Sequence, residues 1–329
     1  MKRLLVIALL AILCGCAVHP LDYQETVILR NYWSDSRLPL TREIATSPYE
    51  GEGYEAYLPY TIIVKNREIF IFDMATPTFV KIDESGNLLA TYTLDSDKCR
   101  AFAVSDDGKV YLRCLVFEKG RGKDFLFEYD LNTRSSKQLF ALDGVADLFY
   151  DDETHAFYRF GSLNRELEIY TQCGKSKVIP IGEMLLEKNG HYYDYENVIH
   201  RNIVYSPIDH IHAENGSYMN GISKYDLKKN RIDCIMAKGR DFGFVILGID
   251  SNETIYSATD WEPTHILVHD AKGNFLAEIT PDYSKYGSAE RGAGSEFHHP
   301  PFISEEGGIY LLVLRREGIF VIKYSAVTD

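Results

Sequence analysis

Residues 126–140 read LFEYDLNTRSSKQLF, and residues 222–236 read ISKYDLKKNRIDCIM. In both stretches an alternation of apolar and polar residues ends in Tyr-Asp, a polar turn follows, and a second alternation begins. Such alternation is typical of β-strands, and clusters of Asn, Asp, Ser and Gly are typical of turns. The chain therefore contains the same strand–turn–strand unit twice, which indicates an internal repeat.

The repeated unit has four strands. Within 101–142, turn residues separate strands predicted at Phe102–Ser105, Val110–Phe117, Phe125–Tyr129 and Lys137–Ala141. The second strand recurs as EIFIFD (68–73), KVYLRC (109–114), HAFYRF (155–160), DHIHAE (209–214), TIYSAT (254–259) and GIYLLV (308–313). The third strand recurs at 78–83, 125–130, 166–171, 221–226, 265–270 and 319–324. The fourth strand recurs only at 88–94, 136–142, 177–182, 231–236 and 275–280.

Four-stranded units that recur every 40–55 residues or so are typical of β-propeller blades. The sequence therefore predicts an all-β fold, a six-bladed β-propeller of four-stranded antiparallel blades. The sixth unit lacks a fourth strand, and unpaired strand edges are avoided in closed rings. We expect an N-terminal strand to close the ring. The best candidate is LTREIA (40–45), and TVILRNYW (26–33) is a further edge strand.

Three other architectures fit less well. A β-sandwich would not repeat so regularly, and a parallel β-helix has much shorter repeats. A seven-bladed propeller needs one more unit, and the irregular stretch 182–202 could hide a strand pair. Six blades are favoured.

The N-terminus indicates export. Lys2 and Arg3 precede the apolar run 4–13, which is shorter than the roughly 20 residues of a membrane-spanning helix. The run ends in Leu-Cys-Gly-Cys at 13–16, which resembles the lipobox of bacterial lipoproteins. That resemblance implies cleavage before Cys16 and a lipid on Cys16; the alternative is an ordinary secretory signal.

The expected organisation is a signal peptide (1–15), a lipid-anchored linker with an N-terminal edge segment (16–39) and the propeller domain (40–329). The lipobox resemblance implies a bacterial cell-envelope protein that is held on a membrane by its N-terminal lipid, with the propeller in the periplasm or at the cell surface. Ala17 follows the cysteine where an Asp would imply retention at the inner membrane, so the outer membrane is favoured.

The charge disfavours nucleic acid as a partner. The whole chain has a net charge of −13, and the loss of Lys2 and Arg3 from its 35 basic residues leaves 33 against 48 acidic ones, a net charge of −15. Such a surface repels phosphate backbones. No later stretch of the sequence is apolar enough to cross a membrane.

Two cysteines have a local reason to pair. Cys99 and Cys114 flank the turn SDDGK (105–109) at nearly equal distances, so they would be almost opposite each other in a hairpin. An exported protein meets an oxidising compartment, where disulfides persist. A Cys99–Cys114 disulfide and two buried free thiols both fit the pattern. Cys173 and Cys234 have no such local argument.

The strand order, the lipobox and turns such as DESGN (83–87) and DAKGN (270–274) resemble the six-bladed propellers of the NHL-like and TolB-like group, particularly those of bacterial lipoproteins. That group includes sensors, scaffolds and a few enzymes. The resemblance therefore implies the architecture and leaves the function open.

Candidate ligand-binding residues lie in the long loops. Strand order places the loops between blades on the same face as the loops between second and third strands, and these are the longer ones. They include 46–60, 117–124, 182–202, 237–244, 259–265 and 280–301. Their aromatic, Arg and His side chains could hold a ligand, or they could pack the loops and pair with neighbouring acids. The predicted ligand-binding residues are Tyr193, Arg201, Arg240, Trp261, Tyr286, Arg291 and His298.

No catalytic, cofactor or metal signature is recognisable. There is no Gly-x-Ser-x-Gly, and KGRGKD (119–124) lacks the spacing of a phosphate loop. Neighbouring histidines such as His298 and His299 point opposite ways on an extended chain. The sequence therefore predicts a lipid-anchored, non-catalytic protein that holds a protein partner or a small anionic or sugar ligand. The alternatives are a glycan- or peptide-processing enzyme, a hydrolase or lyase, and an envelope assembly scaffold.

Overall fold

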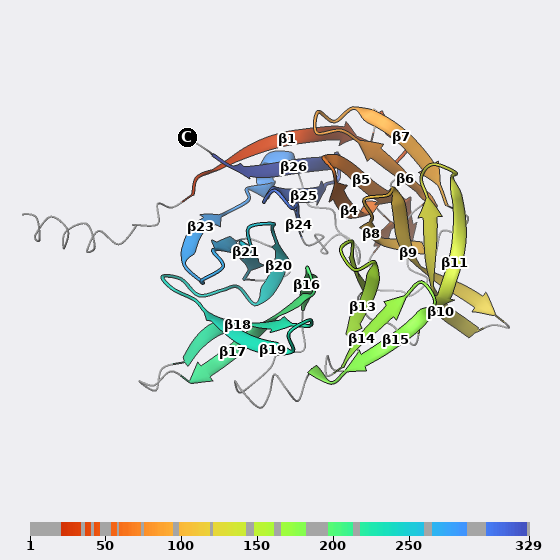
Figure 1. Cartoon of the computed structure of the whole chain (residues 1–329). Helices are drawn as coiled ribbons and strands as arrows, with labels where there is room; N and C mark the ends of the chain where they lie inside the picture. The colour runs from red at the N-terminus through yellow and green to blue at the C-terminus, as the bar shows by residue number, and fades with distance from the viewer. Residues whose placement is uncertain are drawn as a thin grey trace, which may run out of the picture.

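The computed structural model describes residues 21–33, 37–40, 43–46, 54–57, 59–73, 76–94, 99–118, 121–142, 148–160, 166–181, 197–212, 218–259, 265–287 and 301–327. Six four-stranded antiparallel sheets are arranged in a ring as the blades of a propeller (Figure 1). The predicted fold class is confirmed.

Each blade runs from a first strand near the axis to a fourth strand at the rim (Figure 1). Blade 1 consists of β4 (Pro59–Lys65), β5 (Glu68–Asp73), β6 (Thr78–Ile82) and β7 (Leu88–Thr93). Blade 2 consists of β8 (Cys99–Val104), β9 (Lys109–Glu118), β10 (Arg121–Asp130) and β11 (Ser135–Ala141). Blade 3 consists of β12 (Leu148–Asp151), β13 (Ala156–Phe160), β14 (Leu167–Thr171) and β15 (Gly174–Ile179).

The second half of the ring follows the same order. Blade 4 consists of β16 (Val198–His200), β17 (Ile203–His212), β18 (Tyr218–Asp226) and β19 (Arg231–Met236). Blade 5 consists of β20 (Val245–Ile249), β21 (Ile255–Ala258), β22 (Ile266–His269) and β23 (Phe275–Ile279), and the 3-10 helix η2 (Tyr283–Tyr286) follows it. Blade 6 consists of β24 (Phe302–Ile303), β25 (Ile309–Leu314), β26 (Gly318–Ala326) and the N-terminal strand β1 (Tyr23–Tyr32).

An N-terminal strand closes the ring, as predicted, but it is a different strand. β1 pairs with β26 from Tyr23↔Ala326 to Tyr32↔Gly318, with a register shift between Val27 and Leu29. The predicted closing segment 40–45 was the wrong choice, because β2 (Glu43–Thr46) pairs instead with β3 (Tyr54–Tyr57) in a separate two-stranded sheet. The stretch 26–33 was predicted only as a further edge strand, because local patterns do not show which strand pairs with the distant β26.

The second strand of blade 4 begins earlier than its predicted start at residue 209. β17 starts at Ile203, which pairs with Asp226 of β18. The first strand, β16, lies within the stretch 182–202 that the sequence analysis treated as a loop. Pro207 explains the shift, because a proline within an apolar run argues against a strand.

Apolar side chains fill the spaces between blades. Six buried clusters lie within the described ranges, and each combines side chains from two neighbouring blades. In the cluster between blades 6 and 1, Leu29 of β1 packs with Ile71 of β5 and Val321 of β26. The closing strand is therefore part of the core.

Two turns between third and fourth strands contact the preceding blade. In the DESGN turn, Asp83 Oδ1 accepts hydrogen bonds from the backbone of Ser85 and Asn87, both at 2.8 Å. Gly86 has a φ of +79°, and a Cβ atom there would lie 2.3 Å from the carbonyl oxygen of Ile28 in β1. Only glycine permits both this backbone conformation and this approach. The DAKGN turn of blade 5 repeats the arrangement against Met236 of blade 4.

A carboxylate on the DESGN turn connects blade 1 to blade 6. Glu84 Oε1 accepts a hydrogen bond from Tyr310 Oη at 2.6 Å and one from Lys323 Nζ at 2.5 Å. Burial alone would raise the pKa of Glu84, but these two hydrogen bonds outweigh it and lower the pKa below 4.5. The ring closure thus combines strand pairing, a close glycine contact and a charged hydrogen-bond set.

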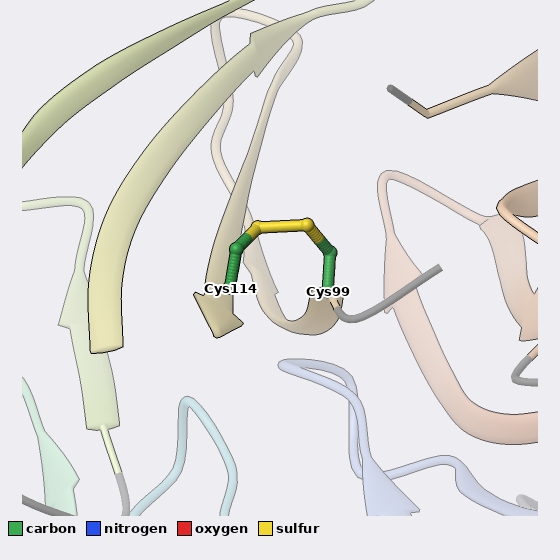
Figure 2. The surroundings of a disulfide bond; sticks show 2 residues. All are labelled: Cys99 and Cys114. Atoms are coloured by element: carbon green, nitrogen blue, oxygen red, sulfur yellow. A yellow bond between two sulfur atoms is a disulfide. The ribbon is translucent and has the colours of Figure 1, made fainter. Parts of the chain in front are cut away.

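A disulfide joins the first two strands of blade 2. Cys99 in β8 is directly opposite Cys114 in β9, and their sulfur atoms are bonded at 2.02 Å (Figure 2). Of the two arrangements that the sequence left open, the structure has the disulfide. Cys173 and Cys234 are free and exposed.

Candidate functional site

The two faces of the propeller differ in the length of their connections. The short-turn face, as we call it, carries the turns between first and second strands and between third and fourth strands. The loop-rich face carries the connections between blades and those between second and third strands. Its longest connections span 33–58, 180–197 and 280–301.

Two groups of charged side chains lie at the centre of the short-turn face. The first group surrounds Lys65. Lys65 ends β4 of blade 1, and its Nζ lies 2.9 Å from Asp106 Oδ1 in blade 2 and also bonds Asp152 in blade 3. The backbone N–H of Asp106 donates to Asp152 Oδ1 at 3.1 Å. Burial alone would lower the pKa of Lys65, but the bonds to Asp152 and Asp106 raise it above 10.5.

The second group surrounds Arg201, in the turn between β16 and β17 of blade 4. Its Nη2 donates to Glu305 Oε2 of blade 6 at 3.1 Å, and its Nη1 donates to the carbonyl oxygen of Ser251 in blade 5 at 3.4 Å. The Ser251 N–H donates to the Glu305 carbonyl oxygen at 2.9 Å. Arg201 and Glu305 are about half exposed, so this pair is weaker than the Lys65 set.

The two groups are related. In blade 1, Lys65 directly precedes a two-residue turn with left-handed backbone, at 66–67. In blade 4, Arg201 is the first residue of the corresponding turn, at 201–202. Each cation forms ion pairs or hydrogen bonds with residues of the next two blades along the ring. Because blades two apart approach each other only at the centre of the ring, these contacts lie near the axis. We call this set the ionic floor; its members are Lys65, Asp106, Asp152, Arg201, Ser251 and Glu305. The floor links blades 1 to 3 and blades 4 to 6 on the short-turn side.

A histidine lies beside the ionic floor. His200 ends β16, and its buried Nε2 has no hydrogen-bond partner. Burial lowers the pKa of His200 below 6.5, and Arg201 lowers it further, although the carboxylate of Glu305 acts in the opposite direction. His200 is therefore neutral at neutral pH.

Arg201 does not lie where the sequence analysis placed it. Arg201 was predicted to belong to the long loop 182–202, but the strand β16 separates it from that connection. Arg201 lies on the short-turn face and pairs with Glu305. Its predicted place on the loop-rich face is wrong, and its predicted contact with a ligand stays a prediction.

Arg240 lies on the loop-rich side, in the connection 237–244 between blades 4 and 5. Its guanidinium bonds Glu278 of β23, and the other oxygen of that carboxylate lies 2.7 Å from His265 Nδ1. The three side chains are 43%, 26% and 42% exposed. Arg240 thus belongs to a half-exposed polar group, the Arg240–Glu278–His265 cluster.

Tyr286 has a structural partner. It ends η2 with only 6% of its surface exposed, and its Oη donates to Glu25 Oε1 of the closing strand at 2.8 Å. Tyr324 donates to the other oxygen of Glu25 at 2.6 Å. Tyr286 therefore fixes the connection after blade 5 to β1.

The remaining predicted residues lie outside the described residues. These are Tyr193, Trp261, Arg291, His298 and the lipid-attachment residue Cys16.

Most residues of the ionic floor were not predicted from the sequence. Asp106 and Asp152 occupy matching positions in the turns SDDG (105–108) and DDET (151–154), so an alignment of the turns could have paired them. Lys65 gave no such signal, because its turn is shorter than theirs.

A buried histidine predicts a pH dependence of stability. His269 is fully buried in β22, and its Nε2 lies 2.8 Å from the carbonyl oxygen of Arg240. Burial lowers the pKa of His269 below 6.5, and the bond to Arg240 and the nearby Asp270 oppose this only in part. The unfolded chain therefore binds the proton first, and the free energy of unfolding falls as pH drops below about 6.5.

Urea unfolding at several pH values between 8 and 5 would check this expectation. The free energy of unfolding of the wild type should fall towards pH 5, and it should fall less steeply in His269→Phe. Some pH dependence should remain in that variant, because the pKa of His200 is also lowered. An equally steep fall in His269→Phe would contradict the assignment to His269.

The described part of the chain contains neither a metal-binding cluster nor a membrane-spanning helix. No group of three or more His, Cys, Asp or Glu side chains there could hold a metal ion. Within the same ranges, no helix has the length and apolar composition that a membrane crossing requires.

The sequence matches no protein-family model and no curated protein. Solved structures with a similar fold include Hsv2 of Kluyveromyces lactis, with 8% identity, coverage of 76% of this chain and 69% of that one, and a TM-score of 0.43. A structural-genomics protein of unknown function from Bacteroides thetaiotaomicron has 13% identity, coverage of 93% and 76%, and a TM-score of 0.49. An oligogalacturonate lyase in complex with manganese has 10% identity, coverage of 94% and 97%, and a TM-score of 0.47. These likenesses concern the fold alone.

Proposed function

We propose that this chain is a lipid-anchored, non-catalytic binding protein that holds a protein partner or a small anionic or sugar ligand on its loop-rich face. One observation carries the proposal. The ionic floor links blades two apart across the short-turn face, whereas the longest connections all lie on the opposite face. A ligand therefore has more varied side chains to meet on the loop-rich face.

The proposed place in the cell rests on the N-terminal sequence. The short apolar run and the Leu-Cys-Gly-Cys stretch favour a lipid on Cys16 and a location in the cell envelope. Ala17 after the cysteine favours the outer membrane. Incorporation of labelled palmitate into the full chain, and its loss in Cys16→Ser, would test the anchor separately from binding.

A thermal-shift screen tests the binding proposal. Purified protein is heated with anionic metabolites, sugars and short peptides, because a ligand that prefers the folded state raises the melting temperature. Hits are then measured against Tyr193→Ala, Trp261→Ala and Arg291→Ala, whose predicted place is the loop-rich face, and against Arg201→Ala on the short-turn face. We expect the first three changes to weaken binding and Arg201→Ala to leave it unchanged. Loss of binding in Arg201→Ala alone would reject the proposed face.

A further inference from the structure

The connection 237–244 lies along blade 5 and is fixed to its outer strands. The Lys238 N–H donates to the Gly273 carbonyl oxygen at 2.8 Å, and the Phe275 N–H donates to the Lys238 carbonyl oxygen at 3.0 Å. Further along, His269 Nε2 lies 2.8 Å from the Arg240 carbonyl oxygen. The outer half of this connection therefore has a defined backbone position.

The inner half of the connection is held by a hydrogen bond and a close backbone approach. The Gly243 N–H donates to the buried Ser257 Oγ at 2.9 Å, and a Cβ atom on Gly243 would lie 2.0 Å from the Ala258 carbonyl oxygen. The ring of Phe242 is buried, with its centroid 4.3 Å from that of His269. The backbone on the N-terminal side of residue 244 is thus fixed against two strands of blade 5.

Phe244 is exposed although its neighbours are buried. It is 57% exposed, whereas Phe242 is 4% and Val245 is 6% exposed. An exposed phenylalanine forgoes about 1.5–3 kcal/mol of burial. Because Phe244 directly precedes β20, the innermost strand of blade 5, it stands at the loop-rich end of that strand, near the axis.

Polar groups lie at the same end of blade 5. His265 directly precedes β22, and Glu278 lies near the end of β23, so both are at the loop-rich end of their strands. With Arg240 they form the half-exposed cluster described above. Its guanidinium and imidazole can donate hydrogen bonds, and its carboxylate can accept them.

We propose that Phe244 is a stacking surface for a sugar ring, and that the Arg240–Glu278–His265 cluster forms hydrogen bonds with hydroxyl groups of the same glycan. This inference rests on the proposed function and names its ligand class. One face of a pyranose ring carries mainly C–H groups, which suit a flat aromatic ring, and its edges carry hydroxyl groups. A single fixed aromatic ring is small against the roughly 800 Å² per partner of a stable protein interface.

Isothermal titration calorimetry of the full folded chain tests this inference. The probes are short oligosaccharides of glucose, xylose, mannose and galacturonic acid, and the variants are Phe244→Ala, Phe244→Tyr, Leu89→Ala and Arg201→Ala. Leu89 is 48% exposed on the rim strand β7 of blade 1, whereas Phe244 belongs to blade 5, so Leu89 serves as a matched control. We expect at least one oligosaccharide to bind, with a Kd about tenfold weaker in Phe244→Ala. Phe244→Tyr and Leu89→Ala should bind as the wild type does, and all variants should keep its melting temperature.

Each contrary result has its own meaning. Equal sugar binding by Phe244→Ala and the wild type would overturn the stacking role and leave the loop-rich binding face standing. If no oligosaccharide binds to the wild type, the carbohydrate class is overturned. If a peptide or an anion binds instead, and binds equally well to Arg201→Ala, the proposed function stands with a different class of ligand. Sugar binding that is lost in Arg201→Ala but kept in Phe244→Ala would overturn both proposals.

Discussion

Gly86→Ala should lower the free energy of unfolding by about 2–5 kcal/mol, because the new methyl group meets the ring-closing strand. The left-handed backbone at φ +79° costs any other residue about 1–2 kcal/mol. The Cβ atom would also lie 2.3 Å from the Ile28 carbonyl oxygen, so β1 or the DESGN turn must shift. Urea unfolding followed by circular dichroism measures the loss.

Gly108→Ala is the matched control. Gly108 has the same φ of +79°, but a Cβ atom there would lie 3.7 Å from its nearest neighbour, Asn132 Nδ2. This variant should lose only the backbone share, about 1–2 kcal/mol. Equal losses in the two variants would mean that the turn of blade 1 does not contact β1 as closely as described.

Glu168→Ala should destabilise the protein by about 3–5 kcal/mol, because it leaves a buried cation without its partner. Arg159 and Glu168 are each 8% exposed, and Arg159 Nη1 donates to Glu168 Oε2 at 3.0 Å. Tyr170 Oη donates to the same oxygen at 2.6 Å, and Lys175 bonds the other oxygen. The loss would be read from the midpoint and slope of urea unfolding at pH 7.

Two further variants separate burial from charge. Glu168→Gln keeps the shape and an acceptor oxygen, so it should lose less stability than Glu168→Ala. Glu153→Gln removes the carboxylate of the exposed Lys228–Glu153 pair and should leave the midpoint of unfolding unchanged. If Glu168→Ala were as stable as Glu153→Gln, the ion pair would not be buried as described.

Much of the fold follows from local signals in the sequence. Strands such as β19 (Arg231–Met236) match their predicted bounds because Asp-containing turns mark their starts and alternation marks their extent. One error arose where a local rule was broken, because Pro207 lies within β17 of blade 4. The other concerns β1, whose partner β26 lies at the other end of the chain, so local patterns do not reveal the pairing.

The candidate site was less predictable for the same reason. The ionic floor joins Lys65 and Arg201 to partners whose positions depend on how the blades meet, and no spacing along the chain encodes that. Phe244 lies in a loop that the sequence analysis identified, but its exposure depends on the contact of Gly243 with Ala258. The type of loop could be predicted from sequence, whereas the direction of its side chains could not.

Hydrogen–deuterium exchange on the full chain, with and without the strongest ligand of the thermal-shift screen, tests most directly which face binds. The proposed function predicts slower amide exchange in the loop-rich connections, including 237–244, and unchanged exchange in the turns 65–68, 105–108 and 200–203. Protection confined to those short turns would contradict it, because the ligand would then lie on the ionic floor.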